Sequence, residues 1–77
     1  MVTAYLLMNV KTGAETNIVD SLKKDKAVKD ITIVYGVYDL VMRLEVKTMN
    51  ELESFILNMR KNKDIEQTST LISTSGN

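Results

Sequence analysis

Residues 38–51 read YDLVMRLEVKTMNE, and this stretch decides the fold. Its first ten residues alternate with a period of two, which is typical of a half-buried β-strand. One face takes Tyr38, Leu40, Met42, Leu44 and Val46, and the other takes Asp39, Val41, Arg43, Glu45 and Lys47. The T-x-x-E pattern of residues 48–51 then predicts a capping box with Thr48 as the N-cap. A strand therefore leads directly into a helix.

The sequence on either side continues this pattern. Downstream, apolar residues at helical spacing run to Met59, basic residues follow them, and residues 65–73 alternate again as a strand. Upstream, residues 28–35 are rich in β-branched side chains, and Gly36 interrupts them. Because only a short gap separates this segment from residue 38, we expect a tight antiparallel hairpin.

The N-terminal half has the same plan. Residues 2–10 predict a strand, and the T-x-x-E at residues 12–15 predicts a capping box with Thr12 as the N-cap. An amphipathic helix to Leu22 follows. The order β-α-β-β-α-β predicts an α+β fold, a ferredoxin-like βαββαβ sandwich with a four-stranded antiparallel sheet and two helices on one face. We expect one domain over residues 1–77, with a core at 2–73 and a frayed tail at 74–77.

Composition excludes several classes of function. The 77 residues carry 10 basic and 10 acidic side chains and contain no His or Cys. Disulfides and zinc or haem ligation are excluded, and we predict no metal, no cofactor and, because no nucleophile–base pair is found, no enzymatic activity. Balanced charge predicts no direct DNA binding. The absence of a long apolar run predicts no membrane association and a cytoplasmic location.

The sheet face without helices predicts self-association. A chain of this size buries only about 60% of its unfolded surface, so a single core gives the folded monomer only marginal stability. The alternation places large apolar side chains on the bare face, where a solvated sheet would be more charged. We expect that face to carry Thr32, Thr68 and Thr70, and a dimer interface made of Tyr5, Leu7, Val34, Val41, Arg43 and Ile72.

Three segments together resemble a known family. Residues 35–41 (YGVYDLV) contain the G-x-aromatic-D pattern, residues 65–72 (IEQTSTLI) contain T-x-T, and residues 47–51 (KTMNE) begin the second helix. Over residues 2–73 the chain resembles the effector-binding domain of Lrp/AsnC transcriptional regulators, called RAM for regulation of amino acid metabolism. The chain has no helix-turn-helix, so it is similar to the stand-alone form of that domain. It also lacks the prolines that often precede strands two and four in the family.

The resemblance implies a small-molecule effector, an amino acid, bound where subunits meet. It also implies assembly into dimers and a larger ring such as a tetramer of dimers, and a full-length Lrp/AsnC regulator is a further candidate partner. The effector-binding candidates are Gly36, Val37, Tyr38, Asp39, Met49, Thr68 and Thr70.

The chemistry of these candidates suggests their roles. Asp39 suits the ligand ammonium or, alternatively, backbone amides of the hairpin. The amides at Gly36 and Val37 and the two threonine hydroxyls suit the carboxylate or side chain. Tyr38 and Met49 suit the pocket wall, although either could instead pack in the core.

Two other classes of protein remain open. An ACT-like amino-acid-binding domain is similar in fold, but the G-x-Y-D hairpin argues against it. A dimeric α+β barrel enzyme has the same topology, but such enzymes generally use a His or a charged pocket residue, and this chain has no His.

Overall fold

A computed structural model describes residues 1–73 and confirms the expected element order. The elements are β1 (Val2–Val10), α1 (Glu15–Leu22), β2 (Val28–Ile33), β3 (Leu40–Val46), α2 (Met49–Met59) and β4 (Ile65–Ile72). The tail expected to fray, residues 74–77, lies outside the described residues. Neither α1 nor α2 combines the length and the apolar composition that a membrane span requires.

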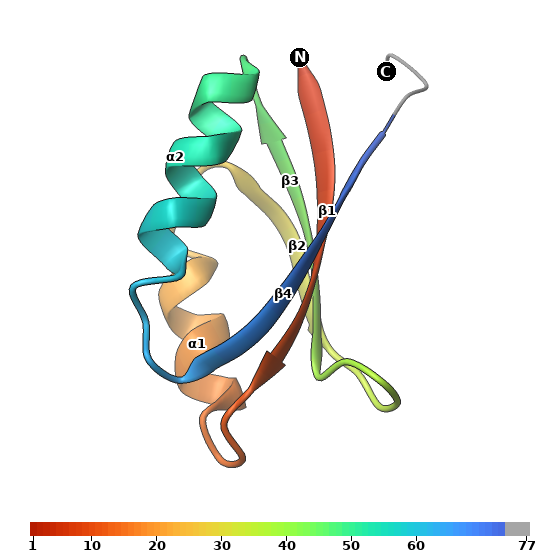
Figure 1. Cartoon of the computed structure of the whole chain (residues 1–77), viewed down its shortest axis with the longest axis vertical. Helices are drawn as coiled ribbons and strands as arrows, with labels where there is room; N and C mark the ends of the chain where they lie inside the picture. Colours follow the sequence, from red (N-terminus) through yellow and green to blue (C-terminus); the bar gives the residue numbers. More distant parts are fainter. Residues whose placement is uncertain (74–77) are drawn as a thin grey trace.

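The four strands form one antiparallel sheet in the order β2-β3-β1-β4. Both helices cover the same face of this sheet, and the other face carries no element (Figure 1). The core lies between the helices and the covered face, as the alternation predicts. Its members are Ala4, Leu6, Met8, Val10, Ala14, Ile18, Leu40, Met42, Leu44, Val46, Leu52 and Met59. The ferredoxin-like α+β fold is therefore confirmed.

The two T-x-x-E patterns behave differently. At α2, Thr48 Oγ1 accepts a hydrogen bond from Glu51 N–H at 3.2 Å, and Glu51 Oε2 accepts one from Lys47 N–H. At α1, the prediction of Thr12 as N-cap is wrong, since the N-cap is Ala14 and no side chain caps it. A turn through Gly13, at φ +92°, bonds Ala14 N–H to Lys11 O and places Thr12 outside the helix start.

The β2–β3 connection is a wider loop than the predicted tight turn. The strands end at Ile33 and begin again at Leu40, and Val34 N–H donates to Asp39 O at 2.8 Å across the loop mouth. Gly36 has φ +123°, a conformation that side chains with a Cβ rarely adopt, so glycine is required there. The loop extends beyond the end of the sheet (Figure 1).

The face predicted for part of β4 is wrong. Thr68, Thr70 and Ile72 pair with Met8, Leu6 and Ala4, which are core residues, so they lie on the helix side of the sheet. The cause is a register shift: Val10 pairs with Ile65 but Asn9 pairs with Gln67. One extra residue in a strand exchanges the faces of every residue after it. Gln67, Ser69 and Leu71 therefore occupy the bare face instead.

Candidate functional site

The sheet face without helices carries an apolar cluster around β1. Tyr5 lies opposite Arg43 on β3 and Leu71 on β4, and Leu7 lies opposite Val41 and Ser69. Tyr5 is 41% exposed and Leu71 is 56% exposed. Strand alternation alone predicts Leu71 on the helix side, and the register shift in β4 places it on the bare face instead. We call this cluster, made of Tyr5, Leu7, Val41 and Leu71, the open-face cluster.

Arg43 is paired on the same face. Its Nη2 lies 2.7 Å from Asp30 Oδ2 on β2, and its Nη1 lies 2.7 Å from Glu45 Oε2 on β3. The hydrogen bond to Asp30, together with the charges of both carboxylates, raises the pKa of Arg43 above its ordinary value. Arg43 therefore remains cationic and already has acidic partners within its own chain, so it would not enter an interface as an unpaired charge.

The loop at residues 34–39 is held to the sheet by three side-chain contacts, the first two of which involve Tyr38 and Asn9. The Tyr38 hydroxyl lies 3.0 Å from Ser69 Oγ on β4, and Asn9 Nδ2 donates to Val37 O at 2.7 Å. Because Ser69 lies on the bare face, Tyr38 lies against that face and is not under the helices. The expectation that Tyr38 shares a core face with Leu40 is wrong, because β3 begins only at Leu40 and strand alternation does not extend back to Tyr38.

Asp39 forms a specific backbone contact. Its Oδ2 accepts a hydrogen bond from Val10 N–H at 2.9 Å, and its own N–H donates to Met8 O at 2.8 Å. The carboxylate thus adds one hydrogen bond to the β1–β3 pairing, at the residue that precedes β3. The alternative structural role expected for Asp39, binding backbone amides of the hairpin, is close to what is observed, but the amide belongs to β1. Oδ1 accepts no hydrogen bond from residues 1–73.

The other candidate residues are separated from this loop. Met49 begins α2, which follows the far end of β3, whereas the loop precedes the near end (Figure 1). The seven residues of β3 span roughly 20 Å at about 3.3 Å per residue. Thr68 and Thr70 lie on the opposite face of the sheet from the Tyr38–Ser69 contact. One chain therefore does not gather the seven candidates into one pocket.

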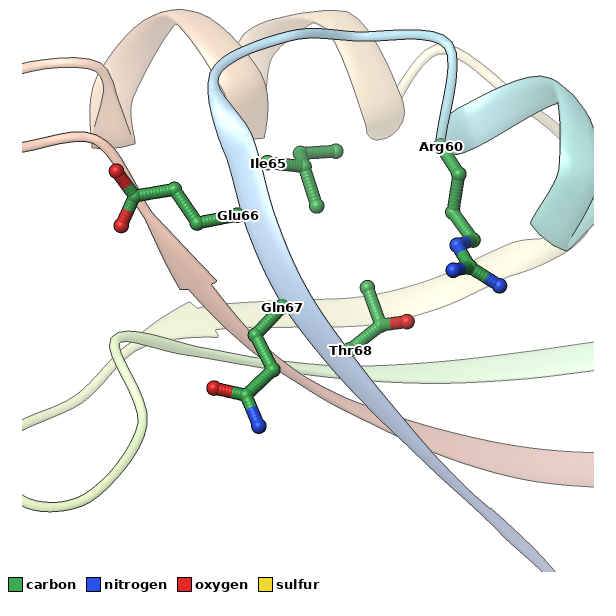
Figure 2. Close-up of a pocket in the computed structure, with 5 residues that line it drawn as sticks. All are labelled: Arg60, Ile65, Glu66, Gln67 and Thr68. Atoms are coloured by element: carbon green, nitrogen blue, oxygen red, sulfur yellow. The ribbon is translucent and has the colours of Figure 1, made fainter.

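A hollow on the helix side involves a residue that the sequence did not single out. It has a volume of about 300 Å³ and is lined by Arg60, Ile65, Glu66, Gln67 and Thr68. Figure 2 shows Arg60, which follows α2, and Thr68, on β4, reaching toward the same space. Arg60 looked like part of a basic helix end, and the sequence carries no signal that places it beside β4. Within residues 1–73, no cluster of His, Cys, Asp and Glu side chains is suited to hold a metal ion.

Comparison with known proteins identifies the family. The model of the Lrp/AsnC ligand binding domain matches residues 3–76. The HTH-type transcriptional regulator PH0140 of Pyrococcus horikoshii is 35% identical over 75 residues, which are 96% of this chain and 48% of PH0140. The chain belongs to the Lrp/AsnC ligand-binding domain family, whose members are domains of transcription regulators.

Solved structures share the fold closely. The crystal structure of FFRP-DM1 is 39% identical with a TM-score of 0.92, and the match covers 95% of this chain and 99% of that one. The structure of the regulator NMB0573 of Neisseria meningitidis in complex with L-Met is 14% identical with a TM-score of 0.86, covering 97% of this chain and 51% of that one. At 14% identity, the likeness to NMB0573 establishes a shared fold and nothing further. The chain spans about half the length of the curated relatives it matches.

Proposed function

We propose that this chain is a regulatory, non-enzymatic domain that assembles with itself and binds a small amino acid at sites shared between subunits. The observation that carries the proposal is the separation of the candidate binding groups. Asp39 lies at one end of the sheet and Met49 at the other, and Thr68 lies on the face that Tyr38 does not reach. A loop from a second chain, placed beside α2 and β4 of the first, would complete a site.

The open-face cluster supports the first step of assembly. In the proposed dimer two copies pack their bare faces together, which buries Tyr5, Leu7, Val41 and Leu71 between two sheets about 10 Å apart. Val34 and Thr32 extend the same surface toward β2. Ile72 contributes to the helix side of β4 instead, so it is removed from this interface.

The chemistry of the loop suits an ammonium group. Asp39 uses Oδ2 for the Val10 N–H, and its Oδ1 is available to accept a charge-assisted hydrogen bond. The backbone at Gly36 and Val37 and the hydroxyls of Thr68 and Thr70 supply donors, and Tyr38 and Met49 supply walls. NMB0573, a regulator of the same fold, has been solved with L-Met. An amino acid is therefore the ligand class we propose.

Ligand binding at a shared site would be coupled to assembly, because a molecule that bridges subunits favours the state containing the bridge. We propose a ring of dimers, such as a tetramer of dimers, as that state. A full-length Lrp/AsnC regulator in the cytoplasm is the proposed heterologous partner, since the ligand-binding domain of that regulator and this chain would present the same open face and loop. Direct DNA contact is assigned to that partner.

A thermal-shift screen of the twenty amino acids tests the proposal. A ligand at 100 times its Kd adds about 2.7 kcal/mol to the free energy of unfolding, which raises the Tm of a domain of this size by roughly 10–20 °C. We expect one or a few amino acids to raise the Tm and to change the mass measured by light scattering. If no amino acid at millimolar concentration changes either quantity, the sensing function is wrong.

A further inference from the structure

The hollow in Figure 2 lies where the end of α2 faces the first residues of β4. We infer that it binds the carboxylate of a small molecule, with Arg60 as the principal binding group and Thr68 as a second donor. The amino acid of the proposed function would be one source of this carboxylate, and to that extent the inference rests on the proposed function. A simple organic acid would be recognised by the same chemistry.

Arg60 is an uncommitted cation at a fixed position. Its backbone N–H donates to Ile56 O at 2.9 Å, which closes the helix and fixes its Cα. Its guanidinium makes no ion pair or hydrogen bond with residues 1–73, whereas Arg43 is paired with two carboxylates. A free guanidinium presents five N–H donors in a planar fork that matches a carboxylate.

Thr68 reaches this hollow only because of the shift in β4. That shift turns the threonine to the helix side, opposite Met8, and its hydroxyl makes no hydrogen bond with residues 1–73. Figure 2 shows its oxygen on the side of Arg60. Ile65 packs against the core at the back of the hollow and offers an apolar surface to the carbon chain of a ligand.

The acidic residue that lines the hollow does not compete for Arg60. The side chains of Glu66 and Gln67 are directed away from Arg60, toward the other side of the strand (Figure 2). Gln67 pairs with Asn9 on the bare face, which agrees with this direction. The volume of about 300 Å³ is at the lower end of the range for small-molecule pockets, so a short carbon chain fits best.

The charges around the hollow are mixed, and the guanidinium of Arg60 is the group that attracts an anion. The C-terminal end of α2 carries about half a negative charge and the Glu66 carboxylate, which also lines the hollow, carries a full one, so an anion is attracted only where it contacts the guanidinium itself. Arg60 is exposed, however, and solvent screening weakens its attraction for a lone carboxylate. We therefore expect a simple acid to bind weakly, and a ligand that also contacts the loop of a second chain to bind more tightly.

Butyrate is the direct probe, and butyramide is its neutral control. Both are titrated into ¹⁵N-labelled protein, and the Arg60 side-chain Nε–H and the Thr68 backbone amide are followed by NMR. We expect butyrate, and not butyramide, to shift both signals. Arg60→Gln should weaken butyrate binding about ten- to a hundredfold, since it removes a charge-assisted hydrogen bond. Lys61→Gln removes the same charge one residue away from the hollow and should change binding by less than about twofold.

The outcomes separate this inference from the proposed function. If butyrate binds Arg60→Gln as well as it binds the parent, or shifts neither Arg60 nor Thr68, the carboxylate site is wrong. If an amino acid raises the Tm of the parent and of Arg60→Gln equally, the sensing function stands and the assignment of Arg60 fails. If butyrate binds at the hollow and no amino acid binds, the carboxylate site stands, its ligand is an organic acid, and the sensing function fails.

Discussion

The hydroxyl of Tyr38 lies 3.0 Å from Oγ of Ser69, although Tyr38 leads into β3, Ser69 lies on β4, and β1 separates these two strands in the sheet. Tyr38 comes just before β3, and Ser69 is on β4, with its side chain on the bare face of the sheet. This contact links the loop that carries Asp39 to the edge strand that carries the two candidate threonines. It therefore sets the position of the loop relative to β4.

Tyr38→Phe tests this link. Removing the hydroxyl deletes one part-buried hydrogen bond, so we expect the free energy of unfolding to fall by about 0.5–1.5 kcal/mol. Urea denaturation measures the change. Ser69→Ala is the matched variant, and the double variant should cost less than the sum of the two single changes because both remove the same bond. Additive effects would mean that the hydroxyls do not interact.

The two T-x-x-E patterns provide a second test. Thr48→Ala removes the side-chain cap of α2 and should lower the free energy of unfolding by about 1 kcal/mol. Thr12→Ala is the control, because Thr12 does not cap α1 and the change should be close to neutral. Thermal denaturation of both variants makes the comparison. Equal losses at the two positions would contradict the assignment of Ala14 as the N-cap.

Leu7→Lys tests the open face as a dimer interface. Leu7 lies at the centre of the cluster between Val41 and Ser69, and burying an unpaired ammonium there costs several kcal/mol. We expect a folded monomer at micromolar concentration by light scattering, where the parent is a dimer or larger. Leu57→Lys makes the same substitution on α2, at a residue that is 66% exposed, and should leave the sheet-face dimer intact. A monomeric parent would disprove the interface.

Asp39 has two roles that substitution can separate. Asp39→Asn keeps an oxygen to accept the Val10 N–H but removes the charge, so amino-acid affinity should fall about ten- to a hundredfold with little change in stability. Asp39→Ala should show the same loss of affinity and also lower the free energy of unfolding by about 1–3 kcal/mol, because the Val10 N–H loses its partner. Calorimetry and denaturation measure the two effects. Unchanged affinity in Asp39→Asn would remove Asp39 from the ammonium site.

The purified chain should not bind duplex DNA. Its 10 basic and 10 acidic residues balance, and a DNA-binding surface needs an excess of positive charge. An electrophoretic mobility assay at roughly 150 mM salt, a physiological ionic strength, checks this. A sequence-specific complex that survives that salt concentration would contradict the prediction.

The alternation of apolar residues by itself determined the architecture of this protein. Period-two patterns located β1, β3 and β4, and β-branched residues located β2. Helical spacing located both helices, and the handedness of the crossovers placed the helices on one face. The strands and helices depend on interactions that are local in sequence. The placement of the helices follows from the right-handed crossover, which holds for almost every connection between parallel strands. The residue pattern also indicated the cap at Thr48 and the turn at Gly36, for the same reason.

Tertiary structure alone decided which side chains meet. The shift between Ile65 and Gln67 moved Thr68, Thr70 and Ile72 to the helix side, and it exists only because β4 pairs with Asn9 and Val10 more than fifty residues earlier. The same long-range packing brings Asp39 to the backbone amide of Val10 on β1 and places Arg60 beside β4. Strand alternation is a local property, so the sequence predicts which residues share a face of an isolated strand. Register is a property of two strands together, so the partner strand decides where a bulge moves the following residues to the opposite face.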